Sequence, residues 1–435
     1  MHRSTIVSPG HLPGKGSIVI QQRSLEELLA DEARSDHDAS RSLEKGECQS
    51  PAGKRCGLCL ASTFPYDKEL PLKTRSLLHF WQDHAFPFPL SPLVASPAGR
   101  GYRTVTKRRV FSSREGWVLG LIDTSIGGYH HAFPVVRCAI EPFGHAAIYA
   151  TANESLNKPY AASLAERLRY VVIKGSYDEF TVILNVTDSS PQVAKGANTL
   201  SKALTRAHKE IAGVHLYEDT SDGRYYLGGD EPGEKRMKKL FGKGSLFQRI
   251  GGRPFLYDPG SFSQVNQSIV ASLVDTAARL LVLQNRQTLY DLYCGYGLFS
   301  LCLAPYVKRV VGAEISRASI SAAVANAERQ KLSNARFLRS DITAEAINTI
   351  MKGASPEDIV LLDPPRNGTA PGVIEEIAAR RPVRVLHLFC NNELIQREME
   401  RWKTGGYRGT RAIPFDMFPG TAAVEILVLL EREQS

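Results

Sequence analysis

The second half of the 435-residue sequence predicts an α/β fold built on a doubly wound, mainly parallel sheet. From residue 260 onward, short apolar runs of strand length alternate with helical segments. Repeated strand–helix units of this kind form parallel sheets with helices on both faces. The last two apolar runs are joined by a short loop containing Pro and Gly, so we expect these two strands to pair antiparallel.

The elements of this half follow in order. An amphipathic helix is expected over 263–283. Strands are expected at 288–294, 309–314, 335–340, 358–363, 384–390, 409–415 and 424–430. Helices are expected between the first five strands and after the fifth. Seven strands that end in an antiparallel hairpin are the pattern of class I methyltransferases.

The region before this sheet mixes strands and helices. We expect a helix over 161–168, strands over 170–174 and 179–186, and a helix over 194–211, where apolar residues recur at helical spacing. This order predicts a small α+β domain. We therefore expect four parts. A mobile tail with one or two helical turns spans 1–45, and a cysteine segment with the start of the central domain spans 46–140. The central domain spans 141–258, and the methyltransferase-like domain spans 259–435.

The composition indicates a globular protein with a polyanionic partner or a merely basic surface. The net charge is +9 and the sequence pI is about 9.1. Basic residues concentrate in 103–109 and 235–253, which are candidates for phosphate contacts or for a solvated face. We expect no membrane span and no signal segment, hence a cytoplasmic location with reduced cysteines.

A short glycine loop ends the first strand of the predicted sheet. Gly295 and Gly297 allow the backbone to pass close to a ligand, but Ser300 stands where a dinucleotide loop has its third glycine. The loop therefore fits S-adenosylmethionine better than NAD. Glu314 ends the second strand, where a carboxylate can hold ribose hydroxyls, and Asp341 follows the third, where it can bind the adenine amino group.

One cysteine and two carboxylates stand at ends of neighbouring strands, Asp363, Cys390 and Glu425. Arg366 follows Asp363-Pro364-Pro365, where enzymes that methylate amines have an aromatic residue, so methylation of an exocyclic amine is disfavoured. Methylation at a pyrimidine C5 needs a thiolate that adds to C6 and a base that removes the C5 proton. Cys390 and Glu425 could supply them; the alternatives are a buried strand cysteine and an edge-strand carboxylate in solvent.

Six motifs in order resemble the RNA uracil-C5 methyltransferases of bacterial 23S ribosomal RNA and of the transfer RNA T-loop. They are Ser263-Gln264-Val265-Asn266, Asp291-Leu292-Tyr293-Cys294-Gly295-Tyr296-Gly297, Asp363-Pro364-Pro365-Arg366, Cys390-Asn391, Asp416-Met417-Phe418-Pro419 and Glu425. The resemblance implies Cys390 as nucleophile and Glu425 as base. It further implies cofactor contacts from Gln264, Tyr293, Glu314 and Asp363. Phe262, Tyr293 and Phe389 could stack on a flipped target base; the alternative for each is a place in the core.

The sequence departs from the family at two places. Asn392 replaces the proline that usually follows Cys390-Asn391. The stretch 420–423 lacks the two histidines that usually precede the base. These changes bear on rate and substrate positioning more than on the type of reaction.

Four cysteines in the first third suggest a metal site, namely Cys48, Cys56, Cys59 and Cys138. Zinc and a 4Fe–4S cluster both accept four thiolates. The segment 47–73 resembles the iron–sulfur segment of the 23S branch, and Cys138 matches its distant fourth ligand. We expect this cluster, without the N-terminal OB-like domain that one group of that branch carries. Cys294 and Cys302 are expected to be structural.

The resulting hypothesis is S-adenosylmethionine-dependent C5-methylation of a uridine in 23S ribosomal RNA through a covalent bond between Cys390 and uracil C6. The same reaction on transfer RNA is one alternative. A noncatalytic RNA-binding protein that kept the fold is the other, because the histidines are missing.

Overall fold

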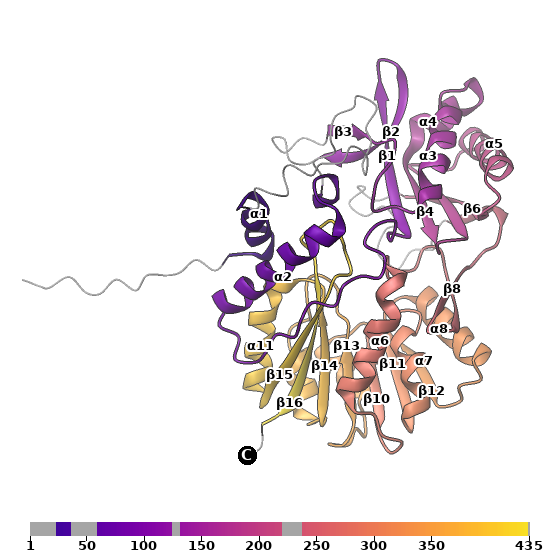
Figure 1. Ribbon diagram of the computed structural model, residues 1–435. Helices are drawn as coiled ribbons and strands as arrows, with labels where there is room; N and C mark the ends of the chain where they lie inside the picture. Colours follow the sequence, from indigo (N-terminus) through magenta and orange to yellow (C-terminus); the bar gives the residue numbers. More distant parts are fainter. Residues whose placement is uncertain (1–22, 36–58, 124–130, 220–236, 434–435) are drawn as a thin grey trace, which may run out of the picture.

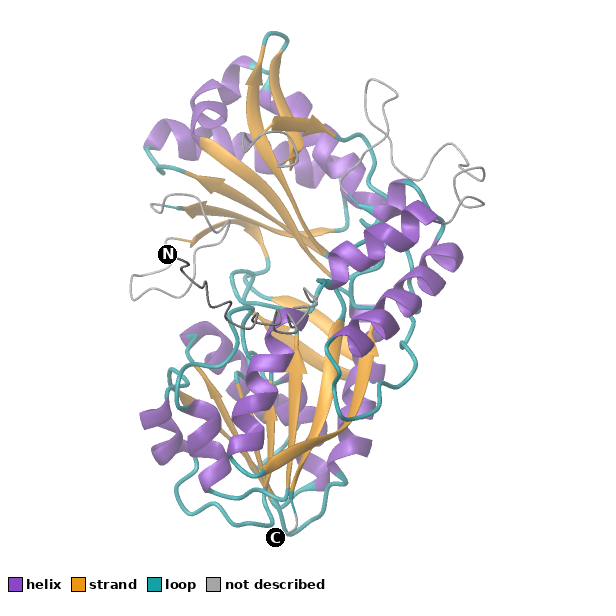
Figure 2. Cartoon of the chain, turned by 90° about the vertical axis from the view of Figure 1, so that its left-hand side faces the viewer, coloured by secondary structure: helices purple, strands orange, loops and turns teal. Residues whose placement is uncertain are grey.

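The computed structural model describes residues 23–35, 59–123, 131–219 and 237–433. Within these ranges the chain forms two seven-stranded sheets, which lie one above the other in Figures 1 and 2. In the described part of the chain, every helix is too short or too polar to span a bilayer.

The C-terminal sheet has the strand order β12-β11-β10-β13-β14-β16-β15. Its strands are β10 (Thr288–Leu292), β11 (Arg309–Glu314), β12 (Ala335–Arg339), β13 (Ile359–Leu362), β14 (Arg384–Phe389), β15 (Tyr407–Phe415) and β16 (Glu425–Arg432). The first five run parallel, whereas β16 pairs antiparallel with both β14 and β15. The seven strands and the antiparallel hairpin confirm the predicted class I methyltransferase sheet.

Helices cover both faces of this sheet, as in a doubly wound fold. One face packs against α6 (Gln267–Leu281), α7 (Leu298–Leu303) and α8 (Arg317–Arg329). The other packs against α9 (Ala344–Ile350), α10 (Val373–Ala379), α11 (Ile395–Thr404) and α2 (Tyr66–Asp83). The helix expected over 263–283 begins only at Gln267, because 263–266 is held in non-helical contacts with the rest of the chain.

The central sheet has the order β3-β2-β1-β4-β5-β6-β7. Its strands are β1 (Val105–Ser113), β2 (Gly116–Asp123), β3 (His131–Pro134), β4 (Leu168–Gly175), β5 (Phe180–Val186), β6 (Ile211–Glu218) and β7 (Met237–Gly242). One face packs against α3 (Phe143–Leu156), α4 (Ala162–Arg167) and α5 (Pro191–Ala207). The helix expected over 194–211 instead begins at Pro191, which suits a first helical turn, and ends before β6.

Smaller elements join these two layers. The hairpin of β8 (Leu246–Ile250) and β9 (Arg253–Tyr257) packs into the core of the C-terminal domain beside α6. Short 3-10 turns complete the chain, namely η1 (Leu60–Ser62), η2 (Pro159–Ala161), η3 (Ala304–Tyr306) and η4 (Asn392–Leu394).

Part of the expected N-terminal tail is an ordered helix, α1 (Leu25–Ser35). Leu25, Leu28 and Leu29 are buried, and α1 packs along α2. This helix is longer than the one or two turns expected, because three leucines on one face bury enough apolar surface to hold it against α2. The rest of the expected tail lies outside the described residues.

Candidate active site

Asp363, Cys390 and Glu425 lie at one edge of the C-terminal sheet. Asp363 and Cys390 follow β13 and β14, which are parallel neighbours, and Glu425 begins β16, which runs antiparallel beside β14. β15 lies outside β16, so β16 is an inner strand and Glu425 is only 4% exposed. The alternative of an edge-strand carboxylate in solvent is therefore wrong.

The thiol of Cys390 is half-buried beside acidic groups. Its Sγ lies 3.8 Å from the carbonyl oxygen of Pro364 and donates toward it. Burial raises the pKa of Cys390 to about 12, and the carboxylates of Asp363 and Glu425 add to this rise. Unlike the buried Cys294 and Cys302, Cys390 retains access to solvent, so a plain buried strand cysteine does not describe it.

The two carboxyl groups of this edge share a buried environment. Burial raises the pKa of Glu425 to about 8, with a further rise from Asp363 and a counteracting effect of Arg366. Burial likewise raises the pKa of Asp363 to about 7, with Asp291 and Glu314 adding to it. Within the described residues, Oε2 of Glu425 has no hydrogen-bond partner. A carboxyl group whose pKa lies near the working pH can both accept and release a proton there.

The glycine loop joins β10 to α7 in left-handed backbone conformations. Gly295 has φ +54° and Gly297 has φ +86°, and Tyr293 between strand and loop has φ +66°. A Cβ on Gly295 would meet nothing within 4 Å, so this part of the loop leaves open space for a ligand. The loop geometry fits the predicted close approach of a cofactor to the backbone.

The carboxylate of Glu314 is fixed against this loop. Its Oε2 accepts a hydrogen bond of 3.2 Å from the backbone N–H of Gly295, and its Oε1 accepts one of 2.9 Å from Ser316. Asp341 is exposed just beyond β12, and Gln264 is buried. The structure thus brings Glu314 to the glycine loop, where a ribose-binding carboxylate is expected.

Sequence reasoning missed the role of Asp291 and Ser300. Asp291 is fully buried, and its Oδ2 accepts hydrogen bonds of 2.8 Å and 2.5 Å from the N–H and Oγ of Ser300. Burial raises the pKa of Asp291 to about 7. Ser300, which replaces a third glycine, therefore ties the start of α7 to β10. The sequence did contain a sign of this contact, because Asp291 is a carboxylate within an otherwise apolar predicted strand.

The three aromatic residues expected to stack on a base differ in exposure. Phe262 is 68% exposed, directly before the Ser263–Asn266 segment. Tyr293 is partly buried. Phe389 is buried and stacks on His387, with ring centroids 4.0 Å apart. Phe389 is therefore a core residue, which is the alternative to a contact with the base.

A buried ionic network holds the loop that precedes Glu425. Lys73 of α2 lies 2.6 Å from Oδ1 of Asp416 and donates at 3.1 Å to the carbonyl of Phe418. Glu69, one turn earlier, accepts a hydrogen bond from the N–H of Gly420. The segment that follows Cys59 is thereby attached to the approach to Glu425, a connection that sequence reasoning did not find.

The four predicted metal ligands are described only in part, because Cys48 and Cys56 lie outside the described residues. The segments that follow Cys59 and Cys138 meet at one turn. Leu60 donates a hydrogen bond of 2.7 Å to the carbonyl of Gly420, and a Cβ at Gly420 would lie 3.0 Å from Cβ of Ala61 and 3.2 Å from Cγ2 of Ile140. Among the described residues, no three His, Cys, Asp or Glu side chains form a metal site.

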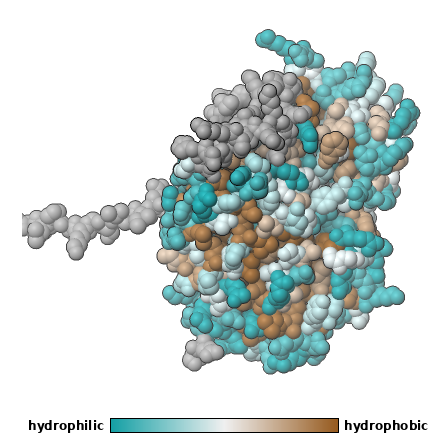
Figure 3. Space-filling model, in the orientation of Figure 1, coloured by the Kyte–Doolittle hydropathy of each residue, from teal (hydrophilic) through white to brown (hydrophobic). Residues whose placement is uncertain are grey.

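The basic segments contribute fewer surface charges than the sequence indicated. Arg108 is buried in an ion pair with Glu141, so it is not the phosphate contact that the 103–109 run predicted. Lys107 is exposed, as are Lys238 and Lys239 on β7. Figure 3 shows hydrophilic residues around the outline of one face, with apolar residues gathered across the lower domain.

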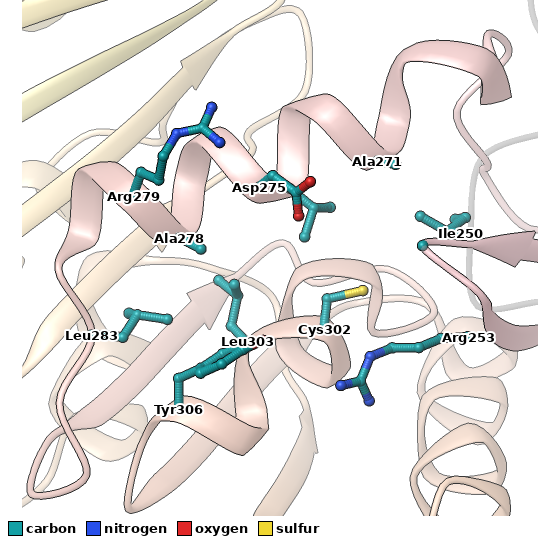
Figure 4. Close-up of a pocket in the computed structure, with 12 residues that line it drawn as sticks. Ile250, Arg253, Ala271, Asp275, Ala278, Arg279, Leu283, Cys302, Leu303 and Tyr306 are labelled. Atoms are coloured by element: carbon teal, nitrogen blue, oxygen red, sulfur yellow. The ribbon is translucent and has the colours of Figure 1, made fainter.

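A separate cavity of about 540 Å³ lies between α6, α7 and the β8–β9 hairpin (Figure 4). Asp275, Arg253 and Cys302 line it, and none of the predicted catalytic or cofactor-binding residues does. The candidate active site is therefore assigned from the convergence of reactive side chains at the sheet edge rather than from this cavity.

The fold and this edge define a class I-type methyltransferase. Residues 245–433 match the family model described as tRNA (Uracil-5-)-methyltransferase. Of solved structures, Pyrococcus abyssi tRNA (uracil-54, C5)-methyltransferase in complex with S-adenosyl-L-homocysteine is similar in fold. Its TM-score is 0.63 at 20% identity, covering 85% of this chain and 84% of that chain.

Relatives extend the match over most of the chain. An uncharacterized RNA methyltransferase of Thermotoga maritima is 28% identical over 87% of this chain and 83% of its own length. Another, of Caldanaerobacter subterraneus, is 25% identical over 96% of this chain and 93% of its own. The C-terminal 245–433 thus matches the uracil-5-methyltransferase family model, and the relatives that match over most of the chain are named RNA methyltransferases.

Proposed function

We propose that this protein methylates C5 of a uridine in 23S ribosomal RNA, with S-adenosylmethionine as methyl donor. The observation that carries the proposal is the convergence of Asp363, Cys390 and Glu425 at the sheet edge that also bears the glycine loop. A nucleophile, a base and a cofactor loop are the parts that this reaction needs.

The residues at the loop fit the donor. Glu314, held by the N–H groups of Gly295 and Ser316, is placed for ribose hydroxyls, and Asp341 for the adenine. Gln264, Tyr293, Gly297 and Asp363 complete the proposed binding set. When bound, S-adenosylmethionine supplies an electrophilic methyl group on a sulfonium.

Cys390 begins the proposed reaction. Its thiol must lose a proton, and Asp363 is the proposed acceptor, so that this proton is not delivered to Glu425, the proposed base of the later step. The thiolate then forms a bond to uracil C6, and the electron pair of the C5–C6 double bond moves onto C5 and O4 as an enolate. Bound S-adenosylmethionine would supply the methyl group for C5, and its thioether would be the leaving group.

Glu425 completes the reaction by removing the remaining C5 proton. The C5–H electron pair restores the C5–C6 double bond as the bond between C6 and Cys390 breaks, which regenerates the thiolate. Burial of Glu425 favours this role because a carboxylate with a raised pKa is a stronger base. Because the stretch 420–423 contains no histidine, the buried carboxylate itself is the proposed proton acceptor.

The proposed 4Fe–4S cluster supports ribosomal RNA as the substrate. Its ligands would be Cys48, Cys56, Cys59 and Cys138. Leu60 is hydrogen-bonded to Gly420 and Ile140 lies close to the same glycine, which is compatible with one site for the two described cysteines. Transfer RNA is the second candidate, favoured by the description of the matching family. The cytoplasm is the proposed location for either substrate.

Mass-spectrometric mapping of 5-methyluridine in ribosomal and transfer RNA, from cells with and without this gene, tests the proposal. We expect one 23S position to lose its methyl group. Loss confined to transfer RNA would select the second candidate. Unchanged RNA of both kinds would favour the noncatalytic alternative.

A further inference from the structure

An exposed arginine–phenylalanine pair lies on the central domain, beside Cys138. Phe143 is 82% exposed at the first position of α3, although the same helix buries Ile148 and Tyr149. The guanidinium carbon of Arg137 lies 5.5 Å from the centre of the Phe143 ring. Both residues line a small cavity of about 140 Å³. An exposed aromatic ring paired with an arginine is the kind of surface on which nucleic-acid bases stack.

This pair is connected to the proposed target site by a ladder of backbone hydrogen bonds. Ile140 accepts a bond of 2.8 Å from Arg103, and Thr104 donates one of 2.9 Å to Val265. Val265 directly follows Gln264 and lies three residues after the exposed Phe262. Adjacent extended segments are about 4.8 Å apart, so two such spacings are about 10 Å. The backbones of Ile140 and Val265 are therefore about 10 Å apart, and Phe143 and Phe262 each lie three residues along the chain from this ladder.

The charges around the pair point to a polyanion. Glu141, the acidic group of this cavity, is neutralised by the buried ion pair with Arg108. Arg100, which also lines the cavity, lies 3.0 Å from Glu69, and Arg137 is exposed at the surface. The site therefore presents a positive charge beside an aromatic face, which suits a phosphate-linked base better than an apolar peptide.

We propose that Arg137 and Phe143 form a second stacking site, which holds an unpaired base of the RNA strand that carries the target uridine. The identity of the polymer as RNA rests on the proposed function. The base would stack on the Phe143 ring, and Arg137 would contact the same base or its phosphate. Such a contact would fix the register of the strand, so that one uridine is presented to Cys390.

Binding of defined oligomers tests this site. The probes are 12-nucleotide oligoadenylate and an abasic ribose-phosphate chain of the same length, measured by fluorescence anisotropy with the full-length protein. Phe143→Ala should weaken oligoadenylate binding by about fivefold or more, as expected for one lost stack, and leave abasic binding unchanged. Arg137→Met should weaken both and lower the salt slope by about one. Phe143→Trp should retain binding.

Tyr306→Ala is the matched control, because Tyr306 is 53% exposed and lines the remote cavity of Figure 4. The proposal is overturned if Phe143→Ala binds oligoadenylate like wild type, if both probes lose affinity equally, or if wild type binds neither. Methyl transfer is measured in a separate assay, so that the proposed function and this binding site are tested independently. A protein that transfers no methyl group but needs Phe143 for base-dependent binding would refute the proposed function and retain this site.

Discussion

At the residue scale, the structure separates reactive groups from structural ones by their surroundings. The position of Cys390 and Glu425 at strand ends was predictable, because their motifs border apolar runs. Their burial was not predictable, since it depends on β15 lying outside β16. The bond from Ser300 to Asp291 was likewise hidden, because it joins a strand and a helix across the glycine loop.

Replacement of Cys390 by Ala should abolish methyl transfer and leave S-adenosylmethionine affinity nearly unchanged. The thiol acts on the base, whereas the proposed cofactor contacts come from the glycine loop and Glu314. Isothermal titration with the cofactor and a methyl-transfer assay measure the two effects. Cys302→Ala, which alters a buried cysteine beside the remote cavity, should keep activity. Turnover by the Cys390 variant would remove the covalent mechanism.

Replacement of Glu425 by Gln should trap a covalent protein–RNA adduct. Addition by Cys390 and methyl transfer can still occur, but elimination needs a base for the C5 proton. The adduct should survive denaturing electrophoresis and carry label from a methyl-labelled cofactor. Wild type should show little adduct, unless the missing histidines already slow the release. Normal turnover without adduct would assign the proton to another group.

The pH dependence of release follows from the raised pKa of Glu425. The carboxylate is the active base, so adduct decay in wild type should accelerate as pH rises through about 8 and then level off. Rapid-quench measurement of adduct decay between about pH 6 and pH 9 gives this profile. A decay rate independent of pH over that range would exclude Glu425 as the rate-limiting proton acceptor.

At the scale of elements, the sequence predicted the strands of the C-terminal sheet to within one or two residues, because apolar periodicity follows burial directly. The sequence did not predict how α2 is bound to the loop that contains Asp416. Lys73, Glu69 and Asp416 are fully buried, and their pairing joins residues more than 300 positions apart. No local pattern encodes such a contact, although two charges one turn apart on an apolar helix face are a visible sign of it.

Replacement of Lys73 by Met should lower the free energy of unfolding by about 3–5 kcal/mol, because Asp416 is left as a buried charge without its cation. Urea denaturation followed by far-ultraviolet circular dichroism measures the loss. Lys68→Met, an exposed change on the same helix, should cost less than about 0.5 kcal/mol. Equal effects of the two variants would show that the buried ion pair does not stabilise the fold.

At the scale of the whole molecule, the sequence indicated a central domain and a C-terminal domain but not which segments complete each of them. β1, β2 and β3 come from residues before 141 and complete the central sheet, and the β8–β9 hairpin packs into the other domain. These assignments depend on long-range pairing, which local periodicity does not report. The turn at Gly420 is where the segments after Cys59 and Cys138 meet the approach to Glu425.

This convergence leads to a prediction about metal content. Protein purified without oxygen should contain about four irons per chain and be brown, and exposure to air should bleach it. Cys59→Ala and Cys138→Ala should each lose most of the iron, whereas Cys302→Ala should keep it. Iron loss should also lower the thermal midpoint, because the cluster would tie 48–59 to Cys138 around the Gly420 turn. Stoichiometric zinc without iron would show that the four cysteines hold a zinc site instead.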